Sequence, residues 1–137
     1  MTYTLDNRLA DDSVPLTTLP LSELRLINDA RFPWLLLIPR RAKLEELVDL
    51  SSSDRLALTT EIDRVSRALR TVSHADKLNV AALGNVVSQL HVHVIARKHT
   101  DACWPKPVWG QGPAVPYTTA ALTELSEQLL TELEAHE

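Results

Sequence analysis

Two histidines and a glutamine alternate with apolar residues in the segment SQLHVHVIARKH, residues 88–99. Side chains at alternate positions of a β-strand point to the same face, so this pattern predicts a strand over 89–97. One face would carry the polar residues Gln89, His91 and His93, and the other the apolar residues Leu90, Val92 and Val94. Imidazole titrates near neutral pH and can act as a nucleophile, a base or a metal ligand. The polar face is therefore the candidate site.

The residues alone leave three roles open for His91 and His93. They could ligate a metal ion such as zinc, if His99, Asp101 or Cys103 folded back to complete the site. They could be structural histidines whose hydrogen bonds are satisfied inside the sheet. One of them could also be a base, or a nucleophile that forms a covalent intermediate.

Apolar patterns elsewhere predict the elements that must position this strand. Further strands are expected as a pair within 13–28 and singly at 31–41 and 77–83, and helices at 51–73 and from about Thr118 onward. In the first helix, apolar residues recur at spacings of four and three: Leu58, Ile62, Val65, Leu69 and Val72. A loop rich in Trp, Pro and Gly spans 103–116. The order of strands, helix, strands, helix has no regular βαβ alternation, which indicates an α+β domain with a mostly antiparallel sheet.

Length and composition favour one soluble domain over residues 1–137. A net charge of −4 without a block of Lys and Arg argues against nucleic acid as a partner. Four basic residues sit at two strand ends, either as solvated charges or as a basic pocket: Arg40, Arg41, Arg97 and Lys98. Cys103 is the only cysteine, and no signal peptide or membrane span is apparent, so we expect a cytoplasmic protein.

The segment 84–95 resembles the motif of the histidine triad (HIT) family, His-φ-His-φ-His-φ-φ on a strand preceded by a glycine-containing loop. Here Gln89-Leu-His-Val-His-Val-Ile95 matches its second and third histidines, with Gln89 at the first position, a variation we associate with a bacterial-type branch. GNVVS at 84–88 fits the family's phosphate loop without a gap. Farther upstream, INDARFPWLLLIPRR at 27–41 is similar to the family's strand-turn-strand segment, and WPKPVWG at 104–110 to its Trp-Pro element.

The resemblance implies a HIT-like fold, with about five strands, one long central helix and a C-terminal helix. It implies that His91 attacks the α-phosphorus of a nucleotide and that His93 stabilises the developing charge. Backbone N–H groups of Gly84, Asn85 and Val86 would hold the phosphate, and Asn28, or alternatively Asp29, would contact the ribose. We expect a homodimer, a nucleotide-conjugate substrate, and neither metal nor cofactor. The 103–116 loop could reach a neighbouring subunit, and its Trp104 and Trp109 could instead stack on a base.

The leading hypothesis is a hydrolase or transferase that cleaves nucleoside 5′-phosphate conjugates, such as diadenosine tetraphosphate or a phosphoramidate, through a nucleotidyl-histidine. The alternative is a nucleotide-sensing module with little turnover, and a two-histidine metalloprotein is the third possibility. An amide cannot donate a proton as an acid. We therefore expect Gln89 to orient substrate by hydrogen bonds, and Gln89→His to raise phosphoramidate turnover more than polyphosphate turnover.

Overall fold

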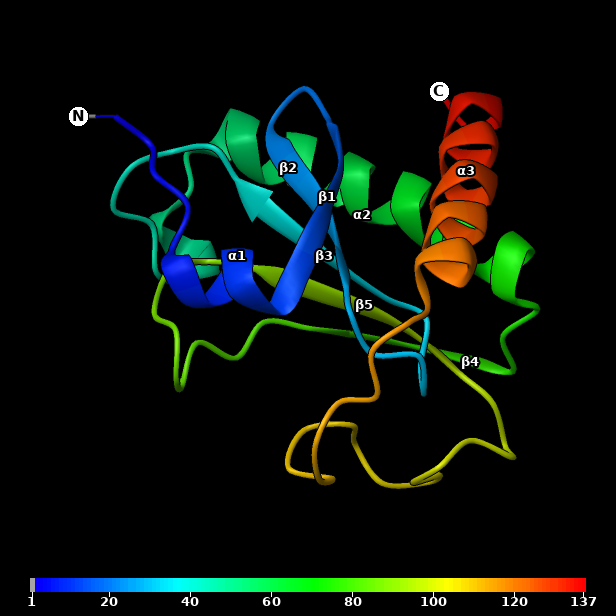
Figure 1. The fold of residues 1–137 in the computed structure, drawn as a ribbon. Coiled ribbons are helices and arrows are strands. Elements are labelled where there is room, and N and C mark those ends of the chain that lie inside the picture. The colour runs from blue at the N-terminus through cyan, green and yellow to red at the C-terminus, as the bar shows by residue number, and fades with distance from the viewer. Residues whose placement is uncertain (1) are drawn as a thin grey trace.

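A five-stranded antiparallel sheet forms the centre of the protein. The computed structural model describes residues 2–137, and its strands follow the order β1-β2-β3-β5-β4 (Figure 1). The strand bounds are β1 Ser13–Thr18, β2 Ser22–Ile27, β3 Trp34–Pro39, β4 Lys77–Ala81 and β5 Val92–Arg97. Every pair of neighbours is antiparallel. The predicted α+β class and number of strands are confirmed.

Both long helices begin where their capping residues predict. They are α2 Ser52–Ser73 and α3 Thr119–Ala135, and the side chains of Ser51 and Thr118 accept backbone hydrogen bonds at their N-termini. Two short elements were not predicted, α1 Asn7–Asp12 and the 3-10 helix η1 Leu47–Asp49, because neither is long enough to show an apolar period. Within residues 2–137, no helix combines the length and apolar character that crossing a membrane requires.

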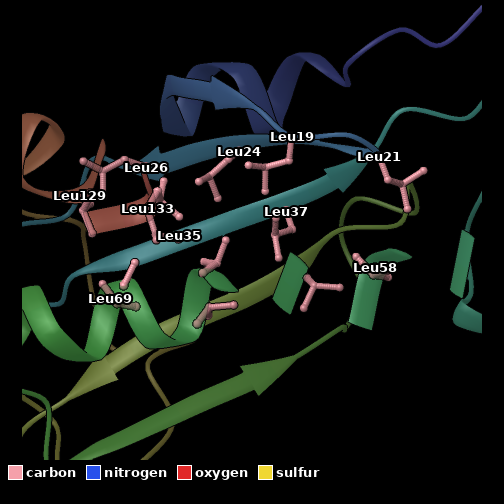
Figure 2. Close-up of a cluster of buried hydrophobic side chains, with 14 of the residues drawn as sticks. Leu19, Leu21, Leu24, Leu26, Leu35, Leu37, Leu58, Leu69, Leu129 and Leu133 are labelled. Atoms are coloured by element: carbon pink, nitrogen blue, oxygen red, sulfur yellow. The ribbon is translucent and has the colours of Figure 1, made fainter. Parts of the chain in front are cut away.

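The main hydrophobic core lies between α2, α3 and one face of the sheet. Leu24 and Leu26 of β2 and Leu35 and Leu37 of β3 are fully buried there. Figure 2 shows these leucines clustered with Leu58 and Leu69 of α2 and with Leu129 and Leu133 of α3. The periodic stripe of the 51–73 helix thus packs on the sheet, as predicted.

The opposite face of the sheet is covered by two separate segments. Leu36 and Ile38 of β3 pack with the N-terminal segment, including Leu9 of α1, and with Val87 of the loop before β5. Trp34 packs with residues of the 103–116 loop, chiefly Val108 and Trp109. Leu36 is paired with His93 in the β3–β5 register, so His93 lies on this second face, where the two covers meet.

Several strand boundaries differ from those predicted, and the strand expected at 31–41 is the shorter β3, Trp34–Pro39. The strand expected at 77–83 ends at Ala81, and the strand expected at 89–97 begins only at Val92. The last pair between β3 and β5 joins Leu37 to Val92, and continuing that register would set Pro39 against Leu90. Proline has no N–H to donate to a ladder, and the Leu90 N–H donates to the Leu44 carbonyl instead. Gln89 and His91 therefore lie in irregular backbone before the strand.

Candidate active site

A hydrogen bond within its own segment holds the His91 ring. Nδ1 of His91 lies 2.6 Å from the main-chain oxygen of Gln89. A carbonyl oxygen only accepts hydrogen bonds, so Nδ1 carries the proton and Nε2 of the neutral ring carries the lone pair. His91 is buried, which limits the ring's freedom further. Nε2 is thus the nitrogen of His91 that can act as a nucleophile.

His93 is held in the opposite tautomer by a residue of the neighbouring strand. The Trp34 indole Nε1–H donates to His93 Nδ1 at 3.0 Å, so the proton of the neutral His93 ring is on Nε2. Burial of the ring, and secondarily the charge of nearby His91, lower the pKa of His93 from 6.5 to about 3. At neutral pH His93 is therefore an uncharged ring with an Nε2–H donor.

The two imidazoles lie side by side under an aromatic cover. The ring centroids of His91 and His93 are 4.9 Å apart with an interplanar angle of 66°. Trp109 meets His93 edge-on at 5.1 Å and Trp34 edge-on at 6.1 Å. The Trp109 indole N–H is buried and has no hydrogen-bond partner among residues 2–137. Trp109 therefore packs against the site within its own chain, whereas Trp104 lies beside His99 at 4.9 Å.

The Gln89 side chain is engaged by the N-terminal segment. Its Oε1 accepts from the Asp6 N–H at 2.8 Å, and its Nε2 donates to the Thr4 carbonyl at 2.9 Å. Gln89 also lines a hollow of about 420 Å³ next to that segment. Another hollow, of about 620 Å³, lies between the β1–β2 turn and the helices. Neither hollow is lined by His91 or His93.

The loop that precedes His91 contains one residue with left-handed backbone. Gly84 adopts φ +76°, the left-handed region that side chains with a Cβ rarely occupy. Asn85 and Val86 are exposed, and Val86 keeps 77% of its surface in solvent. Val87 packs into the cluster under α1, so the loop is anchored at that residue. The outer edge of this loop, at Asn85 and Val86, therefore faces solvent.

Asn28 and Asp29 both fasten the chain that follows the 103–116 loop. Asn28 Oδ1 accepts from the Tyr117 N–H at 2.9 Å. Asp29 is only 2% exposed, and its carboxylate accepts from the Arg31 guanidinium and from the Val115 N–H. These hydrogen bonds outweigh burial and lower the pKa of Asp29. The carboxylate is thus committed within the protein, while the Asn28 Nδ2 group has no protein partner among residues 2–137.

The residues that could have completed a metal site are engaged elsewhere. Arg97 is almost fully buried and donates from Nε to Asp101 at 2.7 Å. His99 contacts Trp104, and the Cys103 thiol lies near the Arg97 guanidinium. Within residues 2–137, no three His, Cys, Asp or Glu side chains gather so that they could hold a metal ion.

The basic residues at the strand ends do not form one pocket, because β3 and β5 run antiparallel and their C-termini therefore lie at opposite ends of the strands. Arg40 donates to the carbonyls of Leu19 and Pro20, and Arg41 pairs with Asp54. Arg97, at the C-terminal end of β5, forms a buried ion pair with Asp101.

Trp34 and the N-terminal segment are the parts of this site that the sequence reasoning missed. Trp34 stood in an apolar run that predicted only burial, and the N-terminal residues showed no periodic pattern. The Trp34–His93 contact spans 59 residues and that of Thr4 with Gln89 spans 85. Only the register of β3 against β5 could have signalled the first of these contacts, since it sets Leu36 opposite His93 and so puts Trp34 on the same face.

Comparison with known proteins places this arrangement in context. The profile of the HIT domain matches residues 9–100. A crystal structure of a histidine triad protein from Sinorhizobium meliloti shares 44% identity over 96% of this chain and 97% of that chain, with a TM-score of 0.94. One from Marinobacter aquaeolei shares 37% identity over the full length of both chains, with a TM-score of 0.96.

More distant structures share the fold. A hypothetical histidine triad nucleotide-binding protein from Sulfolobus tokodaii is 20% identical over 94% of this chain and 88% of that chain, with a TM-score of 0.67. No curated protein matches the sequence.

Proposed function

The chain belongs to the histidine triad (HIT) domain family, and on that basis we propose that it is a nucleotide-binding hydrolase or transferase. Its substrates would be nucleoside 5′-phosphate conjugates, either dinucleoside polyphosphates such as diadenosine tetraphosphate or phosphoramidates, cleaved at the α-phosphate. The observation that carries this proposal is the fixed pair of opposite tautomers, a lone pair on His91 Nε2 beside a proton on His93 Nε2.

In the first step, His91 Nε2 attacks the α-phosphorus. The new P–N bond forms as the bond from phosphorus to the leaving group breaks, and the bonding electrons depart with that group. The His93 Nε2–H donates to a phosphoryl oxygen, where negative charge builds up. Because His93 stays neutral, it acts as a hydrogen-bond donor of fixed direction.

In the second step, water attacks the nucleotidyl-His91 intermediate. The P–N bond breaks, its electron pair returns to Nε2, the nucleoside monophosphate leaves with the water oxygen, and a proton of the water is released to solvent. Another nucleophile in place of water would make the reaction a transfer. A polyphosphate leaves without protonation, whereas an amine needs a proton.

The loop at Gly84, Asn85 and Val86 supports a role in phosphate binding, because Asn85 and Val86 are exposed and successive backbone N–H groups beside a left-handed residue can bind anions. For the ribose we propose Asn28 rather than Asp29, because the Asp29 carboxylate is already bound to Arg31 and Val115. The Asn28 Nδ2 group can still donate to a hydroxyl oxygen.

A nucleotide-sensing module with little turnover is the second candidate. This second candidate is favoured by the amide at position 89, which cannot donate a proton to the leaving group as an acid would and is hydrogen-bonded to the N-terminal segment. A binding protein would take up a nucleotide stoichiometrically without releasing products, so turnover separates the two candidates.

We also propose a homodimer. β4 lies at the edge of the sheet, and apolar side chains are exposed on and after it, at Val80 and Leu83. Sedimentation at micromolar concentration should give twice the chain mass, and a monomer would contradict this. The lone Cys103 supports a cytoplasmic location, since the chain can form no internal disulfide.

Rapid quench with α-labelled diadenosine tetraphosphate tests the covalent step. Label should remain on the protein in a form that is acid-labile and base-stable, as a phosphoramidate bond is. His91→Ala should abolish both labelling and turnover, while the exposed His99→Ala should keep both. Full turnover by His91→Ala would refute the mechanism.

A further inference from the structure

The N-terminal segment is joined to the catalytic face through one residue, Gln89. The Gln89 side chain binds the backbone of Thr4 and Asp6, and its main-chain oxygen accepts from His91 Nδ1. The carbonyl that sets the His91 tautomer thus belongs to a residue whose side chain is tied to a distant part of the chain.

The side-chain amide of Gln89 forms the same pair of hydrogen bonds with the N-terminal segment that a neighbouring strand would form. Its oxygen accepts from the N–H of Asp6 and its nitrogen donates to the carbonyl of Thr4, two residues earlier, at 2.8 and 2.9 Å. This is the donor and acceptor pattern that a β-strand offers along one edge. Each polar atom of the side chain makes one hydrogen bond to this segment, and the two bonds together fix the direction of the amide.

The N-terminal segment is a firm anchor because the sheet holds it in several places. Leu9 is 5% exposed and packs on Leu36 and Ile38. The Tyr3 hydroxyl donates to Glu23 of β2 at 3.1 Å. Asp6 caps α1 by accepting from the Arg8 N–H at 2.8 Å. A residue clamped to this segment has little freedom to move.

We infer that Gln89 is a positioning residue, which clamps Thr4 and Asp6 and thereby fixes the carbonyl that keeps the His91 ring oriented for attack. This rests on the proposed role of His91 but not on the identity of the conjugate. It also accounts for an amide at this position. Imidazole has its two nitrogens pointing apart across a ring, so a histidine could not bind Thr4 and Asp6 together.

The first test compares Gln89→Leu with Gln128→Leu, the same change at an exposed glutamine of α3. In ¹⁵N NMR spectra near pH 7.5, the wild type should show one His91 tautomer with the proton on Nδ1. Gln89→Leu should show a mixture of tautomers, and Gln128→Leu should match the wild type. A single unchanged tautomer in Gln89→Leu would overturn the inference. This readout needs no turnover, so it stands apart from any failure of the proposed function.

The second test removes the other end of the clamp. Asp6 has φ −59°, which proline adopts without strain, so Asp6→Pro deletes the N–H that Gln89 accepts. Asp6→Ala loses the same helix cap but keeps that N–H. Relative to Asp6→Ala, Asp6→Pro should lower kcat about 10-fold with KM within 2-fold, by analogy with the groups that orient metal-binding histidines. Equal kcat in these two variants would contradict the clamp.

A double-mutant cycle tests whether both ends act together. Asp6→Pro combined with Gln89→Leu should be no slower than Gln89→Leu alone, and independent, multiplying losses would overturn the inference. Gln89→His should slow the cleavage of phosphoramidates and polyphosphates alike. A selective gain on phosphoramidates would instead support the original expectation that position 89 lacks a proton donor.

Discussion

The buried ring of His93 should make the fold sensitive to mild acid. Its pKa is lowered from 6.5 to about 3, mainly by burial and next by His91. A histidine in the unfolded chain binds a proton near pH 6.5, whereas His93 in the folded chain does not until about pH 3. Keeping His93 neutral therefore costs the folded chain nothing above about pH 6.5, and the free energy of unfolding falls as the pH drops from there toward 3.

The size of this effect follows from the gap between the two pKa values. In the pH range where His93 is protonated in the unfolded chain but not in the folded one, each unit by which the pH falls lowers the free energy of unfolding by about 1.4 kcal/mol. Between pH 7.5 and pH 4.5, His93 alone should remove roughly 3 kcal/mol, a large share of the stability of a small domain. The lower end of this interval approaches the ordinary pKa of glutamate, about 4.3, so the part due to His93 is measured as a difference between the wild type and a variant without this ring.

Urea unfolding at several pH values measures this loss. His93→Asn is the informative variant, because the asparagine oxygen can still accept the Trp34 N–H and cannot be protonated. It should lose roughly 3 kcal/mol less than the wild type between pH 7.5 and 4.5. His99→Asn, at an exposed histidine, should keep the steep slope. Equal slopes for the wild type and His93→Asn would show that His93 is not a buried neutral ring.

Three further changes probe other contacts. Trp34→Phe should release the His93 tautomer, because it removes a hydrogen bond worth about 1 kcal/mol, and the ratio of the two tautomers in ¹⁵N NMR spectra should change roughly fivefold. Trp109→Phe removes an indole N–H that has no partner among residues 2–137, so it should leave the His93 tautomer fixed. Glu61 is buried and accepts from two backbone N–H groups of the β1–β2 turn at 2.7 and 3.1 Å. Glu61→Ala should therefore lower the free energy of unfolding, measured in urea, by about 2–4 kcal/mol. A loss below about 0.5 kcal/mol would mean that water replaces the carboxylate. Gly84→Ala and Gly110→Ala each place a Cβ on backbone of similar positive φ without a close clash, so each should lower the free energy of unfolding by about 1–2 kcal/mol. Only Gly84→Ala should also weaken AMP binding in calorimetry. Equal AMP affinities of the two variants would show that this loop does not bind the phosphate.

Much of the fold could be predicted because its signals are local. The stripe from Leu58 to Val72 and the Ser51 cap lie within one helix, and they place α2 to within a residue. The apolar run at 34–38 predicted a strand buried on both faces, as β3 is. The irregular backbone at 89–91 could not be predicted, because it depends on Pro39 and Leu44, which lie far away in the sequence.

The sequence by itself determined the family, because the two histidines, their spacing and the glycine-containing loop before them form one continuous motif that needs no tertiary contact to be seen. Tertiary structure alone decided which nitrogen of His93 carries the proton and what holds the Gln89 side chain beside His91. His93 takes its tautomer from Trp34, and the Gln89 residue that holds His91 is bound to Thr4 and Asp6. Each of these contacts depends on how strands and termini separated by more than fifty residues pack against one another. No local pattern encodes such a contact, so a hydrogen bond that chooses one nitrogen over another becomes visible only in the folded chain.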